Sequence, residues 1–96
     1  MCTYVTTTSA VERGSAYGGD DWFRATRAVV YFDHPQDVAL DHALCIDVWG
    51  DGGRRVAVEL DAGSARRLAE SILGVLGSRE VEDVLEPLAV AHQGDV

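Results

Sequence analysis

The run HALCIDVWGDGGRRVAVELDAGSARRLAESILGVLG, residues 42–77, decides the fold because it contains two strand patterns, a turn and a helix pattern. Residues 42–49 and 54–60 carry branched apolar side chains at alternate positions, which is typical of β-strands. The glycine-rich GDGG between them predicts a tight turn. Apolar residues then recur at three- and four-residue steps between positions 65 and 76, and this spacing predicts an amphipathic helix.

Two further strand patterns precede this run. Residues 3–13 are rich in Thr and Val, and residues 22–33 are apolar and aromatic. Gly18-Gly19 predicts a two-residue hairpin turn between them, and Pro35 ends the second strand because proline cannot donate to a β-ladder. The predicted fold class is therefore α+β: a four-stranded antiparallel meander with one main helix packed on one of its faces.

A chain of 96 residues has the length of a single domain. We expect residues 1–77 to form the sheet-plus-helix domain, and residues 78–96 to form a short helix, capped by Ser78, and a loose acidic tail. No apolar run approaches the roughly 20 residues that span a bilayer, and the N-terminal residues lack a signal-peptide pattern. A cytoplasmic location follows, in which Cys2 and Cys45 are free thiols.

Charge excludes several classes of partner and chemistry. The net charge of −8 disfavours nucleic acids and anionic membranes, because both would be repelled. All eight basic residues are arginine, so the chain has no lysine for Schiff-base or pyridoxal phosphate chemistry.

Matching the apolar positions across the turns predicts the strand register. A turn at Gly18-Gly19 places Val5 opposite Phe32, and the next turns place Phe32 opposite Leu44 and Leu44 opposite Leu60. One continuous apolar face results, which the helix is expected to cover.

The same register makes His34 and His42 cross-strand neighbours at one end of this face. Asp33 lies beside them, and Cys2 is expected to arrive at the same corner. Two imidazoles, a carboxylate and a thiol are ligands for a divalent transition metal, zinc or similar. The alternative interpretation is structural, with Asp33 capping a turn and His34 half exposed at a strand end.

The opposite face of the sheet is predicted to be half apolar, with Tyr31, Cys45, Trp49 and Glu59 upon it. Such a patch marks either an interface or a ligand groove. One interpretation is a homodimer packed sheet to sheet. The other is a small-molecule site with Tyr31, Trp49 and Glu59 as ligand-binding residues.

Three segments carry a resemblance to a known family: MCTYVT at 1–6, WFRATRAVVYFDHP at 22–35 and VAVELDAGSARRLAESI at 56–72. Together they resemble a family of small actinobacterial proteins of unknown function, with MCTY and FDHP as the most distinctive parts. The resemblance implies a bacterial, cytoplasmic protein and no assigned activity, and it is not expected to include the chain from Ser78 onward.

Two functional hypotheses follow, and neither assigns a catalytic residue. In the first, the chain is a small bacterial protein with a transition-metal site at His34 and His42, acting as an enzyme or accessory factor of secondary metabolism. In the second, it is a metal-free homodimeric protein that binds a ligand or a partner and has no catalytic activity.

Overall fold

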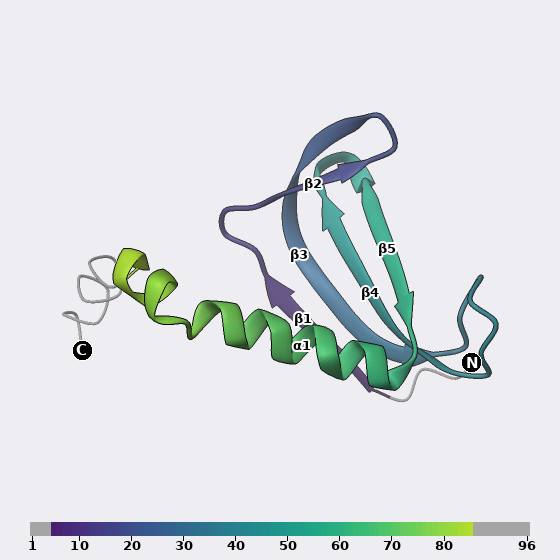
Figure 1. The fold of residues 1–96 in the computed structure, drawn as a ribbon. Helices are drawn as coiled ribbons and strands as arrows, with labels where there is room; N and C mark the ends of the chain where they lie inside the picture. The colour runs from purple at the N-terminus through teal and green to yellow at the C-terminus, as the bar shows by residue number, and fades with distance from the viewer. Residues whose placement is uncertain (1–4, 86–96) are drawn as a thin grey trace. The chain divides into compact units, whose positions relative to one another are not determined.

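A computed structural model of the chain describes residues 5–85, and these fall into two compact units that divide after Ala62. The first unit is an antiparallel sheet with strand order β1-β3-β4-β5, and β2 pairs with β3 outside this path (Figure 1). Its strands are β1 (Val5–Ala10), β2 (Ser15–Gly18), β3 (Asp21–Asp33), β4 (Ala43–Gly50) and β5 (Arg55–Leu60). The second unit is helical, so the α+β class and the antiparallel meander predicted from the sequence are confirmed.

The predicted register of the meander is confirmed at each of its three pairings. Val5 lies opposite Phe32, Phe32 opposite Leu44, and Leu44 opposite Leu60. Directly paired residues have their side chains on the same face of a sheet. These four apolar residues therefore form one row across the strands, next to the loop that joins β3 to β4.

Strand β2 and its turn differ from the prediction. Strand β1 ends at Ala10, and residues 11–14 form an irregular segment before β2 pairs with the first part of β3. Its ends still contact β3, because Val11 N donates to the Thr26 carbonyl and Ala25 N donates to the Gly14 carbonyl, both at 2.9 Å. Gly18 pairs with Asp21, so the turn is at Gly19-Asp20, one residue later than expected. Gly19 has a φ of 71°, which only glycine adopts at low cost. The two additional residues on the β1–β2 side are taken up by segment 11–14, so the register of β1 is unaffected.

Strand β3 bends where it changes partner. Its pairing with β4 shifts by one residue between Ala25 and Arg27, which is a β-bulge. Gly50 pairs with Ala25 beside this bulge, and a Cβ at Gly50 would clash with the Phe23 ring and the Arg24 carbonyl. Gly50 therefore allows β4 to approach the bent part of β3 closely.

The most buried side chains of β4 are on the face opposite the apolar row. Ala43, Cys45 and Asp47 are 0%, 3% and 6% exposed. Cys45 is a free, buried cysteine, as predicted. The centre of this face is thus already buried within one chain, which corrects the expectation of a broad exposed patch there.

In the second unit, helix α1 (Ala62–Leu76) is followed by a helical segment at 79–85. Ser78 Oγ accepts a hydrogen bond from Val81 N at 3.4 Å, so the predicted N-cap is confirmed. The packing of α1 on the sheet stays a prediction. No helix within residues 5–85 combines the length and apolar character needed to cross a membrane. The expectations for Cys2 and for the acidic tail after residue 85 fall outside the described residues.

Candidate functional site

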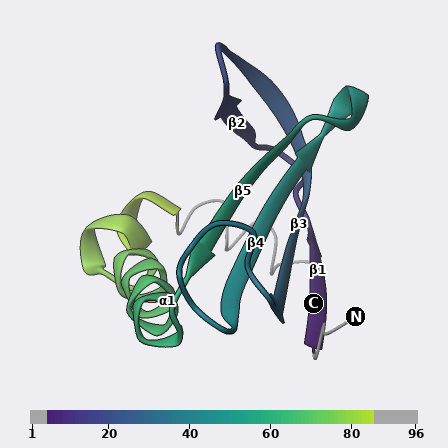
Figure 2. The ribbon, with the colours of Figure 1, turned by 90° about the vertical axis from the view of Figure 1, so that its right-hand side faces the viewer.

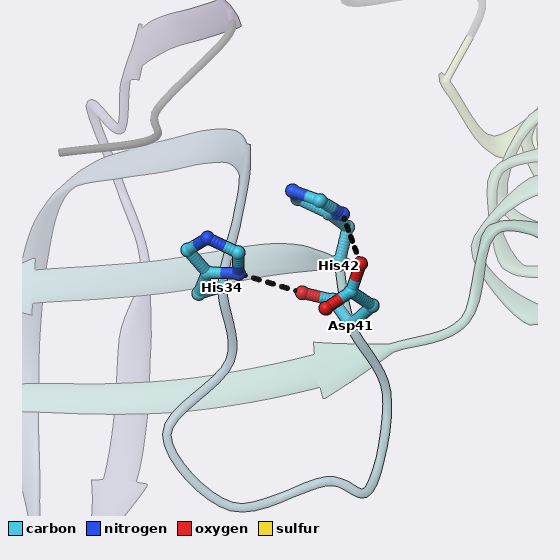
Figure 3. Close-up of side chains that lie close together, drawn as sticks. All are labelled: His34, Asp41 and His42. Atoms are coloured by element: carbon cyan, nitrogen blue, oxygen red, sulfur yellow. Dashed lines mark hydrogen bonds and ion pairs between the residues drawn. The ribbon is translucent and has the colours of Figure 1, made fainter.

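The β3–β4 loop brings the two histidines together. Asp33 and Ala43 form the last pair of the ladder, so His34 and His42 are the next residues on either side of the loop. Their rings stack with centroids 4.5 Å apart and an interplanar angle of 27° (Figure 3). They are cross-strand neighbours, as the predicted register requires.

Phe32 supports this pair from the strand below. Phe32 and His34 are two residues apart, so they share one face of β3. The His42 ring stacks on Phe32 with centroids 5.6 Å apart and an interplanar angle of 14°. His42 is therefore half-buried between two aromatic rings, whereas His34 is exposed.

Asp41 contributes both a backbone and a side-chain contact. His34 Nδ1 lies 2.8 Å from the Asp41 carbonyl oxygen, and His42 Nδ1 lies 3.5 Å from Asp41 Oδ2 (Figure 3). Because a carbonyl oxygen only accepts, a neutral His34 donates from Nδ1 and keeps its lone pair on Nε2. One ligand atom from each of His34, Asp41 and His42 can be chosen so that all three lie within 4.8 Å of one another.

The carboxylate beside the histidines is that of Asp41, whereas the sequence analysis assigned Asp33. Asp33 Oδ1 accepts a hydrogen bond from His34 N at 2.6 Å, and strand alternation places Asp33 on the face of β3 opposite to Phe32, whose ring stacks on His42. Asp41 precedes His42, but it lies in the loop outside the ladder, where alternation does not apply. The repeated Asp-His dipeptide was the signal in the sequence that could have found it.

The donor set fits a transition metal better than a hard cation. Two imidazoles and one carboxylate are typical ligands of zinc and non-haem iron, whereas calcium and magnesium prefer oxygen ligands. The ring stack fits less well, because both lone pairs must converge on one ion. Metal–nitrogen distances of about 2.0–2.1 Å therefore require the rings to turn out of the stack and the three donor atoms to approach one another to about 3.4 Å.

A second polar cluster lies on the opposite face of the sheet. Tyr31 Oη donates a hydrogen bond to Asp47 Oδ2 at 3.0 Å, and Arg55 Nη1 lies 3.2 Å from Asp47 Oδ1. Burial, followed by the hydrogen bond to Asp47, raises the pKa of Tyr31 to about 12. Tyr31 is therefore a neutral donor at every physiological pH.

Glu59 holds the β3–β4 loop against the sheet. Its carboxylate accepts hydrogen bonds from the backbone N–H groups of Gln36, Asp37 and Val38 at 2.5, 3.0 and 3.1 Å. These amides, first that of Gln36 and then those of Val38 and Asp37, lower the pKa of Glu59. Figure 2 shows the loop swinging out past β4 toward β5, where Glu59 lies.

The loop and the sheet line a half-open cavity of about 540 Å³. Tyr31 and Glu59, two of the three predicted ligand-binding residues, both line it. Trp49 lies outside this lining, and its ring instead stacks with the guanidinium carbons of Arg27 and Arg55, which are 5.1 and 5.5 Å from its centroid. The cavity volume lies within the range of small-molecule sites, about 300–1,000 Å³.

The fold and the site define a small α+β protein whose β3–β4 loop carries a His–Asp cluster on one side and borders a cavity with charged and apolar lining on the other. Residues 1–85 match the sequence model described as "Family of unknown function (DUF6295)", and the chain belongs to this family. The match continues beyond Ser78, where the resemblance was expected to end. No curated protein and no solved structure matches the chain.

Proposed function

We propose that this protein binds a divalent transition metal ion through His34, His42 and Asp41. One observation carries the proposal: three potential ligand atoms from the two sides of the β3–β4 loop lie within 4.8 Å of one another. The two histidines are eight positions apart in the sequence, and the strand register places them side by side.

The contact between His34 and the Asp41 backbone supports this proposal. Histidines that bind metals usually donate their other ring N–H to a carbonyl or carboxylate, which fixes the tautomer and the ring orientation. His34 Nδ1 already lies 2.8 Å from the Asp41 carbonyl oxygen, so Nε2 is the atom that would bind the metal. We propose Cys2 as a further ligand. Asp33 is less suited than Asp41, because its carboxylate accepts from the His34 amide.

With His34, His42 and Asp41 as its ligands, the ion keeps one coordination position open for water or substrate, whereas Cys2 as a fourth ligand would close it. A metal ion with an open position polarises a carbonyl group or lowers the pKa of bound water. The function that we propose is therefore that of a metal-dependent enzyme or a metal-binding accessory factor, in keeping with the first hypothesis from the sequence.

Metal titration of the purified, untagged protein tests the proposal. The protein is stripped with a chelator and titrated with Zn²⁺ by calorimetry, and its metal content is measured by elemental analysis. We expect stoichiometric binding, weakened more than about a hundredfold by His34→Ala or His42→Ala and about 10–100-fold by Asp41→Asn. His92→Ala, which removes the third histidine of the chain, is the matched control and should bind as the unaltered protein does. Binding that is unchanged in both His34→Ala and His42→Ala contradicts the proposal.

A second candidate function is metal-free ligand binding by a homodimer. The cavity beneath the β3–β4 loop supports its ligand-binding part, because Tyr31 and Glu59 both line it. The homodimer stays a prediction, which light scattering of the chelator-treated protein tests directly. If the protein is a monomer, and its metal binding is weakened by the His34, His42 and Asp41 substitutions as expected above, metal binding is favoured over the second candidate function.

A further inference from the structure

The cavity beneath the β3–β4 loop has more acidic than basic side chains in its lining. Asp37, Asp47 and Glu59 contribute three carboxylates, and Arg55 contributes one guanidinium. The remaining lining includes apolar surface from Ala57 and Val38 and the ring of Tyr31. The lining is therefore complementary to a ligand that has a short apolar body and a positive charge.

Asp47 is the most deeply placed of these carboxylates. It is only 6% exposed, and its Oδ2 accepts the hydrogen bond from Tyr31. Its Oδ1 is buried and accepts no hydrogen bond from any residue in the range 5–85. The 3.2 Å contact with Arg55 Nη1 compensates its charge but not its hydrogen-bonding capacity. An oxygen of this kind gains most from a new N–H donor.

Arg55 can leave Asp47 without losing its other contact. Its side chain is 45% exposed, and its guanidinium also stacks with Trp49, 5.5 Å from the ring centroid. Arg55 thus occupies the position at Asp47 Oδ1 that a cationic ligand would take. Displaced from there, it can still stack on Trp49 and reach water.

Cys45 reports the sign of the local potential. Burial raises the pKa of this thiol first, and the carboxylates of Glu59, Asp47 and Asp33 raise it further. A raised thiol pKa means that a negative charge is disfavoured at this point of the cavity floor. Burial disfavours any charge at this point, whereas the carboxylate contribution favours a cation over an anion.

We propose that this cavity binds a small organic amine, whose protonated nitrogen replaces the Arg55 guanidinium at Asp47 Oδ1. The proposal rests on the second candidate function, ligand binding at the Tyr31 and Glu59 face, and names its ligand class. The amine donates to Asp47 while Tyr31 continues to donate to Oδ2. Its apolar body lies against Ala57 and Val38.

Three probes with one apolar body and different charges test the class of ligand. They are 2-phenylethylamine, 2-phenylethanol and 3-phenylpropanoate, each titrated into the chelator-treated protein and followed by NMR shifts of the Ala57 and Val38 methyl groups. We expect the amine to bind at least about tenfold more tightly than the alcohol, and the anion to bind more weakly than either.

Two variants are expected to change amine affinity in opposite directions. Asp47→Asn keeps the acceptor for Tyr31 but removes the charge, and should weaken binding by about tenfold or more. Arg55→Gln removes the competing cation and should strengthen binding severalfold. Arg27→Gln is the matched control, because Arg27 also stacks on Trp49 but is not among the described residues that line the cavity, and its effect should be less than about twofold.

The outcomes separate the ligand class from the ligand-binding function. If the alcohol or the anion binds as tightly as the amine, or if Arg55→Gln weakens amine binding, the amine proposal is overturned while the cavity remains a ligand site. If no probe shifts the cavity methyl groups, the amine proposal and the second candidate function both fail. Circular dichroism of each variant identifies a loss of fold, and Arg55→Gln still tests the proposal if Asp47→Asn does not fold.

Discussion

The two sides of the β3–β4 loop hold polar clusters of similar size but different character. At the ends of the loop, His34 and Asp41 are exposed, and the ring stack of His34 and His42 is open to solvent on one side. Beneath its middle, Asp47 is 6% exposed and has two polar partners, Tyr31 and Arg55. The histidine cluster has two exposed members, whereas the Asp47 carboxylate is buried and paired in charge with Arg55.

This difference predicts how each cluster contributes to stability. Groups that are buried and paired stabilise the fold, because removing one of them leaves its partner without compensation. Removing an exposed group lowers the free energy of unfolding only a little, since water replaces its contacts. Substitutions should therefore reduce stability beneath the loop and reduce binding at its ends.

The largest loss of stability is expected for Asp47→Ala. Removing the carboxylate leaves Tyr31 without its acceptor and Arg55 without its charge partner, so unfolding free energy should fall by about 2–4 kcal/mol. Asp51→Ala is the control, because it removes an exposed ion pair with Arg24 at 3.5 Å and should cost less than about 0.5 kcal/mol. Urea denaturation measures both, and equal losses would remove the contrast between the two kinds of pair.

Tyr31→Phe should have the next largest effect, about 1–2 kcal/mol, through the lost hydrogen bond to Asp47. The pKa of Tyr31 is raised to about 12, above the usual value of 10.0, so the folded state holds this proton more tightly than the unfolded state. Its contribution is complete below pH 10 and is lost as the pH rises toward 12. Denaturation midpoints measured across this range should show that loss in the unaltered protein and in Tyr17→Phe, but not in Tyr31→Phe.

Glu59→Ala should act locally, on the middle of the loop. Without the carboxylate, the amides of residues 36–38 should exchange with deuterium at least severalfold faster, which NMR resolves residue by residue. Because the pKa of Glu59 is lowered in the folded state, its contribution is present above the unfolded value near 4.3 and is lost as the pH falls through the lower folded value. Glu12→Ala, which removes an exposed carboxylate between β1 and β2, should leave exchange in the loop unchanged.

The smallest effects on stability are expected at the histidines. His34→Ala should change unfolding free energy by less than about 0.5 kcal/mol, because the ring is exposed. His42→Ala should cost up to about 1 kcal/mol, since its ring also stacks on Phe32. Thermal denaturation of both variants, alongside the metal titration, separates a binding role from a structural one. A loss as large as that of Asp47→Ala would make the histidine pair structural.

The sequence predicted the parts of the fold that depend on repeating patterns. The apolar row from Val5 to Leu60 required one register, because a slip of one residue would move every side chain to the other face. That register was enough to bring His34 and His42 together. Strand β2 was missed because residues 11–14 contain two more residues than a simple hairpin allows, and pattern matching does not locate such an insertion.

The contacts of the β3–β4 loop could not be predicted from hydropathy or spacing patterns. Asp41 joins the histidines, and Glu59 holds residues 36–38, through the path of an irregular segment. That path depends on hydrogen bonds from residue 59 to amides more than twenty positions earlier, which have no sequence signature. Trp49 was placed on the correct face, but its neighbours Arg27 and Arg55 determine which surface it contacts.

The hold of Glu59 on the loop also has an entropic consequence for the histidine pair. With residues 36–38 fixed to β5, the loop is divided into two short arcs, 34–35 and 39–42, instead of one long flexible segment. Each arc samples far fewer backbone conformations than the undivided loop. Metal binding that draws the two imidazoles together therefore costs less conformational entropy, because the loop is already restricted before an ion binds.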